Sequence, residues 1–375
     1  MLTAYPPVLQ MHGGGVRMYH NIRILAQKHS VRVISFVENE GERELLRTLD
    51  GICESITPVQ RVPDFRPHWL SLDPFLVRAF STPEMEHAVE AAFRSKKIDV
   101  LQCEYLQMAQ YRRRGVFSVL TIIETQSDNV YAAFQKEHDP VPKLKLFYRW
   151  MQMLRYEVMA TRRFDRIVTM TEEDARYLRS YSPSLDIRAI PIGIDPEEFR
   201  PLASEPNAVL KVIFLGNFRH TPNVEAARFV ATEMAPYFPG IQFVVAGDKL
   251  PQDFNPPNNV QCPGYVPDLR SLYRAPNMIV VAPLFSGTGQ RSKLLEAFSM
   301  ACPVIATSVA AYGYPASSGR ELFIANSPAE FRNALSQLIA SERLRTEVGL
   351  AGRKMIEKHL NWSQIAPRFL EVVTP

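Results

Sequence analysis

The stretch that decides the fold is SGTGQRSKLLEAFSMACPVIAT, residues 286–307. A loop with two glycines leads into a segment with helical spacing, and an apolar run of β-forming residues follows. Parallel strands need a crossover of this kind, because the chain must return to the same end of the sheet before the next strand begins. The stretch therefore predicts one repeat of an α/β domain.

The same alternation continues in both directions along the chain, which implies a parallel sheet in each half. In the first half we expect strands at 31–37, 99–105, 118–124, 166–171 and 187–193, and helices at 16–28, 83–94 and 143–163. Only Met1–Tyr5 remain for a strand ahead of them. In the second half we expect strands at 209–216, 241–248, 259–266, 278–283 and 303–307, and helices at 222–235, 268–274 and 361–373.

Residues 190–208 are rich in proline, acidic and small residues, and we interpret them as a linker between domains. A chain of 375 residues is long for one hydrophobic core and sufficient for two. The predicted fold class is α/β, with two doubly wound domains of similar size.

The composition is that of an ordinary globular protein, with 46% hydrophobic and 22% charged residues. A net charge of +4 is too small to indicate nucleic-acid binding, and it is compatible with an anionic small ligand or with a membrane-facing patch. The four cysteines form no CxxC pair and have no zinc spacing, so no metal site is expected. We expect Cys103 and Cys302 to be buried thiols in a reducing compartment. No signal peptide or membrane-spanning run is visible, and we expect a cytoplasmic protein, with contact at the inner face of the membrane left open.

Glycines follow several of the expected strands in the second half, at Gly216, Gly247, Gly264, Gly287 and Gly289. In doubly wound sheets, ligands bind where the carboxyl ends of the strands meet the helix N-termini. Glycine lets a ligand approach the backbone closely, although such turns also use glycine for structural reasons alone. Together these glycines favour a ligand that carries phosphate.

Charged residues follow this glycine loop at a spacing that suits a nucleotide. Arg291 and Lys293 lie at the start of the expected helix, where free N–H groups and the helix dipole already favour an anion such as a diphosphate. Glu296 lies nearly two turns into the motif, and its carboxylate could accept hydrogen bonds from two adjacent ribose hydroxyls. The alternative is a surface ion pair between Lys293 and Glu296, three residues apart on the helix.

The chain as a whole resembles the GT-B glycosyltransferases of family 4, a retaining group that uses nucleotide-sugars. The resemblance depends on seven segments in this order: GGGVRMYHNIRILAQ, FDRIVTMTEEDARYL, IPIGIDPEEFRP, FLGNFRHTPN, VVAGD, GYVPDLRSLY and GTGQRSKLLEAFSMACPVIAT. It implies two Rossmann-like domains that face a cleft, an acceptor-side domain at 1–188 and a nucleotide-sugar-binding domain at 189–360. The C-terminal helix, 361–375, is expected to pack back on the first domain. It also implies transfer without a metal or other cofactor, with a UDP- or GDP-linked sugar as the donor.

The resemblance assigns expected roles to residues of the second domain. Glu296 matches the second Glu of the family's Glu-x7-Glu motif, the ribose ligand, and Thr288 stands where the first Glu contacts the donor sugar. The amides of Gly287 and Gly289 remain beside Thr288, and Arg291 and Lys293 are expected to bind the diphosphate. Three further positions are also implied: Arg219 as the family's arginine, Val266 as the backbone that reads the base, and Gly216 at the first strand end. The lysine that usually accompanies the arginine is absent near Asn223, and we expect Lys293 to supply that charge.

In the first domain, the resemblance points to a glycine loop and one acid. The Gly13–Gly15 loop matches a loop that approaches the phosphates, so Gly14 and Gly15 are donor-site candidates. Many relatives carry a histidine at the end of the strand that corresponds to 118–124, but residues 122–126 contain none. Glu124 stands where an acid accompanies that histidine, and we expect Glu124 and Thr288 to act on the sugar. The alternative for Glu124 is a solvated charge at a strand end.

Three functions remain open at this point. The first is transfer of a sugar to a glycan or lipid-linked acceptor in polysaccharide biosynthesis. A second is a GT-B protein that has lost catalysis and serves as a binding or partner subunit, and a third is a UDP-sugar epimerase of the same fold. The basic, aromatic segment 143–164 could rest on anionic lipid, but such a stripe more often faces the core, and we favour the core.

Overall fold

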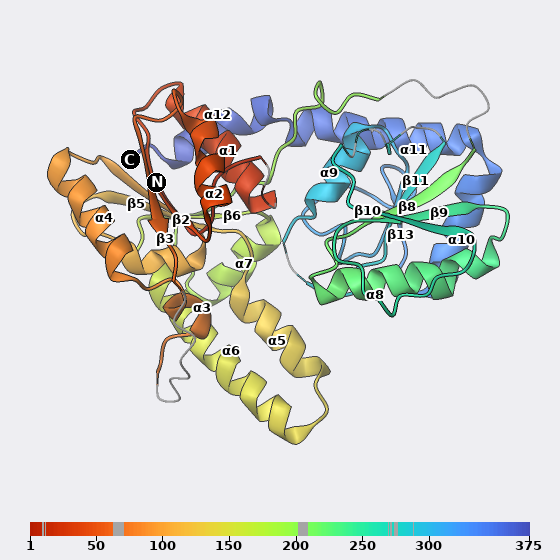
Figure 1. The fold of residues 1–375 in the computed structure, drawn as a ribbon, viewed down its shortest axis with the longest axis horizontal. Helices are drawn as coiled ribbons and strands as arrows, with labels where there is room; N and C mark the ends of the chain where they lie inside the picture. The colour runs from red at the N-terminus through yellow and green to blue at the C-terminus, as the bar shows by residue number, and fades with distance from the viewer. Residues whose placement is uncertain are drawn as a thin grey trace. The chain divides into compact units, whose positions relative to one another are not determined.

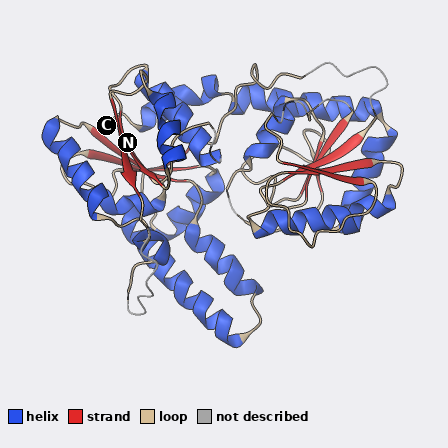
Figure 2. Ribbon diagram, in the orientation of Figure 1, coloured by secondary structure: helices blue, strands red, loops and turns tan. Residues whose placement is uncertain are grey.

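The structure is a computed structural model that describes residues 1–9, 11, 13–62, 71–201, 209–268, 270, 272–273, 277–287 and 289–375. The chain divides into two compact units, Met1–Ile192 with Ile365–Pro375, and Gly193–Gln364 (Figure 1). The sequence predicts a boundary after residue 188 and a returning helix that begins at 361. In each unit a central sheet lies between helices (Figure 2).

The first unit contains a seven-stranded sheet in the order β3-β2-β1-β4-β5-β6-β7, and every neighbouring pair is parallel. Its strands are β1 (Leu2–Thr3), β2 (Arg32–Val37), β3 (Ser55–Gln60), β4 (Val100–Glu104), β5 (Phe117–Ile122), β6 (Arg166–Thr169) and β7 (Ile187–Ala189). Its helices are α1 (Gly13–Ala26), α2 (Glu40–Leu45), α3 (Phe75–Arg78), α4 (Pro83–Ser95), α5 (Gln126–Lys136), α6 (Pro140–Thr161), α7 (Glu172–Tyr181) and most of α12 (Trp362–Val372). All the strands expected in this half are present, and Met1–Tyr5 do supply one.

The central strands of this unit are buried on both faces, as expected for a parallel sheet covered by helices. Leu120 and Ile122 of β5 and Ile167 of β6 have no exposed surface. One expectation is wrong here. The glycine run is not a loop, because α1 begins at Gly13, so Gly14 and Gly15 are part of its first turn.

The second unit contains a six-stranded parallel sheet in the order β10-β9-β8-β11-β12-β13. Its strands are β8 (Lys211–Leu215), β9 (Gln242–Ala246), β10 (Val260–Gly264), β11 (Met278–Ala282), β12 (Val304–Ala306) and β13 (Phe323–Ile324). Its helices include α8 (Thr221–Phe229), α9 (Ser292–Ser299), α10 (Pro328–Ala340) and α11 (Glu342–Met355). The five expected strands are confirmed, and the helix expected at 268–274 lies in part outside the described residues.

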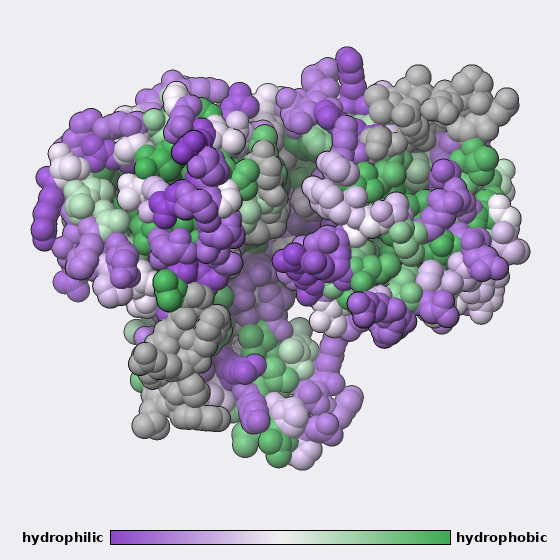
Figure 3. Space-filling model, viewed as in Figure 1, coloured by the Kyte–Doolittle hydropathy of each residue, from purple (hydrophilic) through white to green (hydrophobic). Residues whose placement is uncertain are grey.

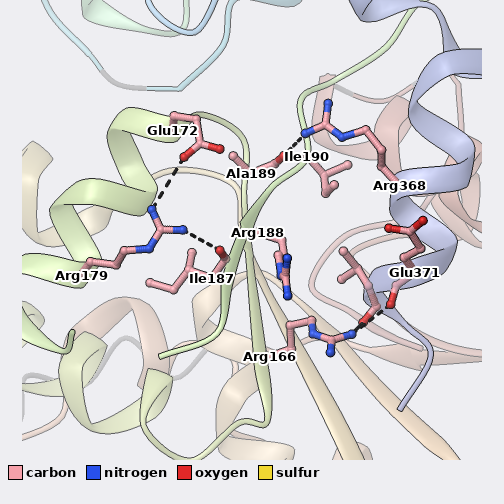
Figure 4. A pocket seen from close by; sticks show the side chains of 10 residues that line it. Arg166, Glu172, Arg179, Ile187, Arg188, Ala189, Ile190, Arg368 and Glu371 are labelled. Atoms are coloured by element: carbon pink, nitrogen blue, oxygen red, sulfur yellow. Dashed lines mark hydrogen bonds and ion pairs between the residues drawn. The ribbon is translucent and has the colours of Figure 1, made fainter. Parts of the chain in front are cut away.

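Helix α12 is held against the edge strand β7 by arginines. Arg166 Nη1 donates to the carbonyls of Glu371, Val372 and Thr374 at 2.9, 2.8 and 3.1 Å, which satisfies backbone oxygens at the C-terminal end of the helix. Arg368 Nη2 donates to Ala189 O of β7 at 2.9 Å. A pocket of about 330 Å³ lies beside this contact, lined by Arg166, Glu172, Arg179, Ile187, Arg188, Ala189, Ile190, Arg368, Glu371 and Val372 (Figure 4). Arg166 and Arg368 therefore fasten helix α12 to the edge of the sheet.

Helix α6 differs from its expected role as a core helix. Met153 and Ala160 are buried in the core of the first unit, as expected, but Leu144, Tyr148 and Met151 are exposed. The expectation of a core face is therefore confirmed for only part of the helix, and the N-terminal part forms a hairpin with α5 that projects from the first unit (Figure 1). Within the described residues, no helix is both long enough and apolar enough to cross a membrane.

Candidate functional site

The carboxyl ends of β8, β9 and β10 approach one another through glycine backbones. Gly216 N donates to Ala246 O at 2.9 Å, and Gly247 N donates to Gly264 O at 2.8 Å. A Cβ atom added to Gly247 would lie 1.6 Å from Gly216 O, and its φ is +147°. Gly247 is therefore required by backbone packing, and it is not by itself a sign of a ligand.

Lys293 reaches this same edge from helix α9. Its Nζ donates a hydrogen bond to Leu215 O, the last residue of β8, at 2.8 Å. The two residues are 78 positions apart in the sequence. Burial lowers the pKa of Lys293 to about 8. The structure thus places the ammonium group beside Gly216, at the carboxyl end of the strand.

Glu296 does not form the surface ion pair that was the alternative for this motif. Neither Glu296 nor Lys293 is fully exposed, and among the described residues no ion pair within 4.0 Å joins the two. The Tyr273 hydroxyl lies 3.5 Å from Glu296 Oε2. Burial raises the pKa of Glu296 to about 7. A half-buried carboxylate near its titration point can accept hydrogen bonds from a ligand at neutral pH.

The loop before α9 wraps the Arg291 side chain. Arg291 Nη2 lies 3.4 Å from Ser286 O, and a Cβ atom at Gly287 would come within 2.6 Å of the same nitrogen. Gly287 also has a φ of +96°, which favours glycine. Gly289 is buried with a φ of +79°, and Thr288 between them lies outside the described residues. Arg291 is the N-cap residue of α9 and makes no side-chain capping bond, so the start of this helix carries no acid or cap to compete with an anion.

Two tyrosines that have no expected role in the sequence support this site. Tyr273 is fully buried against Glu296, and Tyr314 OH donates to Arg291 O at 2.6 Å. Both therefore hold the backbone or side chain of a candidate residue. In the sequence, Tyr273 is marked only by its position in the segment GYVPDLRSLY, and Tyr314 belongs to none of the motifs.

Arg219 and Val266 lie farther out on the second unit. Arg219 forms an exposed ion pair with Asp248, with 3.3 Å between Nη2 and Oδ2, just beyond the ends of β8 and β9. Asn223 Nδ2 donates to Asn217 O at 2.7 Å, so this residue braces the turn and supplies no charge. Val266 is half-buried and follows the exposed Tyr265. The described structure shows no contact between these residues and Lys293.

In the first unit, the glycine turn of α1 packs closely on the preceding chain. A Cβ atom at Gly15 would lie 2.5 Å from Met11 Cβ and 3.1 Å from Pro6 O. One turn later, Arg17 pairs with Glu104 at 3.3 Å, and both side chains are completely buried. Burial raises the pKa of Glu104 and lowers that of Arg17. The sequence does not predict this ion pair, because its spacing cannot distinguish a buried arginine from an exposed one.

Glu124 lies after β5, where its carboxylate is fixed by the start of α5. Gln126 Nε2 and Asn129 Nδ2 donate to it at 2.8 and 3.4 Å, so it is not a freely solvated charge. Behind it, Gln126 N donates to Glu157 Oε1 at 3.0 Å, and Ser127 Oγ donates to the other oxygen of Glu157. Glu157 of α6 therefore caps α5, and burial raises its pKa to about 7.

The candidate residues fall into two sets, one in each unit. Gly14, Gly15 and Glu124 belong to the first unit, and the other candidates among the described residues belong to the second. In the second unit the structure brings together Gly216, Lys293 and Glu296, with Gly287, Gly289 and Arg291 at the start of α9. Within the described residues, no group of three or more His, Cys, Asp or Glu side chains is arranged to hold a metal ion.

Two family descriptions match the chain in succession. Residues 11–198 match Glycosyltransferase Family 4, and residues 210–341 match Glycosyl transferases group 1. The chain belongs to glycosyltransferase family 4. This transferase is therefore an enzyme of the group 1 type, as the resemblance implied.

Solved structures confirm the GT-B fold of the transferase. It is similar to a sucrose-phosphate synthase from Thermosynechococcus elongatus, with a TM-score of 0.75 and 17% identity over 99% of this chain and 96% of that one. It is also similar to Alr3699/HepE from Anabaena in complex with UDP and glucose, with a TM-score of 0.66 and 13% identity over 99% and 98%. Among curated proteins, it is 20% identical to an uncharacterized 44.6 kDa protein in the cps region of Klebsiella pneumoniae, over 84% of each chain.

Proposed function

We propose that the transferase moves a sugar from a nucleotide-diphosphate sugar to a glycan or lipid-linked acceptor, with retention at the anomeric carbon. The observation that carries the proposal is the position of Lys293 at the end of β8, one turn from Glu296 on the same helix. The similar Anabaena protein is described in complex with UDP and with UDP-glucose, which supports a nucleotide-sugar donor. We expect UDP or GDP to be the nucleotide.

In this proposal, each candidate group of the second unit has one task. Glu296 accepts hydrogen bonds from two ribose hydroxyls, and the backbone at Val266 contacts the base. Arg291, Lys293 and the α9 N-terminus stabilise the negative charge that develops on the leaving diphosphate. These groups are all supplied by the chain, so the proposal uses neither a metal nor another cofactor.

The first unit supplies the acceptor side in this proposal. A retaining transfer can proceed by attack on the same face from which the diphosphate leaves, and the leaving phosphate then takes the proton of the acceptor hydroxyl. No protein base is required for that step, which is consistent with the lack of a histidine in 122–126. Glu124, fixed by Gln126 and Asn129, would orient the sugar or the acceptor.

Donor turnover tests the proposal. The purified protein is incubated with UDP- and GDP-linked sugars, and released nucleoside diphosphate is measured together with the anomeric form of the product by NMR. We expect release from one donor only, an α product from an α donor, and a large loss of rate in Glu296→Gln. A product of inverted configuration would contradict retention, and release that Glu296→Gln leaves unchanged would contradict the site.

A second candidate is a nucleotide-binding protein without catalysis. Thr288 in the position of the family's first Glu and the missing histidine favour it. Binding of a nucleoside diphosphate without any turnover of its sugar donors, in a folded protein, would support this candidate. Conversion of a UDP-sugar to its epimer without transfer would instead indicate an epimerase.

We also propose a place for the reaction. The relative from Klebsiella pneumoniae lies in a cps region, which supports a role in polysaccharide biosynthesis. The proposal puts the enzyme in the cytoplasm, at the inner face of the membrane, where a lipid-linked acceptor would be accessible. Fractionation of cells that express a tagged full chain tests this location.

A further inference from the structure

The outer face of α6 exposes a stripe of large apolar side chains. Val141 and Leu144 are 64% and 69% exposed, and Tyr148 and Met151 are each nearly half exposed. Their spacing of three, four and three residues places them on one side of the helix. Figure 3 shows hydrophobic residues beside hydrophilic ones on the surface of this hairpin. Scattered exposed apolar residues are ordinary, but a continuous stripe of this kind marks an interaction surface.

The stripe is not needed to hold the hairpin together. Another face of α6 packs on α5 through an aromatic cluster, in which the Trp150 ring lies 4.8 Å from that of Tyr131 between centroids, and the partly exposed Phe147, 5.8 Å from Trp150, lies between this face and the stripe. Lys143 Nζ also points inward, because it donates to Glu137 O at 2.9 Å and lies 5.3 Å from the Phe134 ring. The hairpin therefore has its own core, and the stripe faces away from it.

The charge beside the stripe has one sign. Lys145, Arg149 and Arg155 are exposed on the outer side of α6, and residues 140–156 contain no Asp or Glu. An apolar stripe bordered by Lys and Arg is the pattern of a helix that lies in the interface of an anionic membrane. A second copy of this face would bring like charges together, which disfavours a symmetric dimer through it.

We propose that the outer face of α6 docks the enzyme on a lipid bilayer with anionic headgroups. Val141, Leu144, Tyr148 and Met151 enter the headgroup region, and Lys145 and Arg149 contact the anionic headgroups. This inference goes beyond sugar transfer. It does not depend on the identity of the donor or acceptor, and lipid binding can be measured in a protein that transfers nothing.

Vesicle co-sedimentation of the full chain tests the proposal. Vesicles of phosphatidylcholine alone are compared with vesicles that also contain phosphatidylglycerol, at low and at high salt. We expect binding to the anionic vesicles only, weakened by salt, because each basic residue near the surface adds electrostatic attraction that salt screens. Equal binding to both kinds of vesicle, or binding to neither, would overturn the proposal.

Two variants locate the surface. K145E with R149E should weaken binding to anionic vesicles about 30-fold or more, and L144S with M151S should weaken it without changing the salt dependence. Matched controls in the second unit are K358E and L350S, which change an exposed charge and an exposed apolar side chain elsewhere. Control variants that lose as much binding as the α6 variants would overturn the proposal.

Folding and self-association are checked on the same samples. Because all four α6 positions are exposed, the variants should melt within a few degrees of the wild type. Sedimentation velocity without lipid reports the oligomeric state. A dimer that dissociates in L144S with M151S, in a protein that does not bind anionic vesicles, would show that a second copy covers the stripe and would overturn the membrane assignment.

Discussion

The Lys293 ammonium group donates a hydrogen bond to the backbone carbonyl of Leu215 at 2.8 Å, and this contact joins helix α9 to the end of strand β8. It uses one of the three N–H donors of the lysine, so the others can reach a ligand at the same edge. The contact fixes the position of a cation where the ends of β8 and β9 already meet through Gly216 and Gly247. The proposed diphosphate site follows from this geometry.

Replacement of Lys293 should weaken binding of a phosphate-bearing ligand selectively. We expect K293M to bind the preferred nucleoside diphosphate at least about tenfold more weakly, because charge-assisted bonds to phosphate contribute roughly 1.5–3 kcal/mol each. The corresponding nucleoside without phosphate should bind equally well to both proteins. Calorimetry with K354M as the control measures this, and an equal loss for nucleoside and nucleotide would show that the lysine acts on the fold and not on phosphate.

Nucleotide affinity should be greatest between about pH 7 and pH 8. Below this window Glu296, whose pKa burial raises to about 7, becomes protonated and loses acceptor capacity. Above it Lys293, whose pKa burial lowers to about 8, loses its positive charge. Dissociation constants measured from pH 5.5 to pH 9.5 should give a bell-shaped curve, and E296Q should remove only the acidic limb. A flat profile for the wild type would exclude both assignments.

Glu157 should make the first unit less stable as the pH rises from about 4.5 to about 7. Its pKa in the folded protein, about 7, is above the ordinary value of 4.5, so the folded state binds the proton more tightly than the unfolded chain. The folded protein therefore loses up to about 3 kcal/mol of unfolding free energy across this interval, and this residue causes no further loss at higher pH. Urea titrations of wild type and E157Q at several pH values measure the difference. E157Q should lack this pH-dependent loss of unfolding free energy. If the unfolding free energies of the wild type and E157Q changed in parallel with pH, the prediction would be contradicted.

Removal of one partner of the buried Arg17–Glu104 pair should destabilise the first unit strongly. R17M leaves a buried carboxylate and E104L a buried guanidinium, and each should lower the unfolding free energy by about 3–5 kcal/mol. The double variant should lose much less than the sum, because no charge is left unpaired. R343M, which breaks an exposed pair with Glu347, should change stability by less than about 1 kcal/mol. Additive losses in the double variant would show that the two side chains are not coupled.

Strand and helix alternation made most of both sheets predictable, but two edge strands were missed. β3 contains Pro58, which cannot donate to a sheet ladder and is tolerated because, among the described residues, β3 pairs only with β2. β13 has two residues, too few for a periodic signal. Periodicity also predicts a core face for α6 but does not reveal its exposed apolar stripe, because an apolar stripe has the same spacing whether it faces a core or a partner.

The sequence predicts which residue types form the candidate site, but it does not predict which residues they contact. The spacing of Lys293 and Glu296 allowed both a surface ion pair and a ligand site. The bond from Lys293 to Leu215 decides between them, and local sequence carries no information about a partner 78 residues away. The same reason explains why Tyr273 and Tyr314, which reach α9 from other segments, were not expected.

The central claim is that the start of α9 holds a nucleoside diphosphate, and thermal unfolding tests it most directly. The melting temperature of the wild type is measured with UDP, GDP, ADP and dTDP, alongside K293M and E296Q. Because a ligand that binds only the folded state raises the melting temperature, one nucleotide should stabilise the wild type, and both variants should show a clearly smaller shift at the same concentration. If no nucleotide shifts the folded wild type, or if the variants respond as the wild type does, the claim is contradicted.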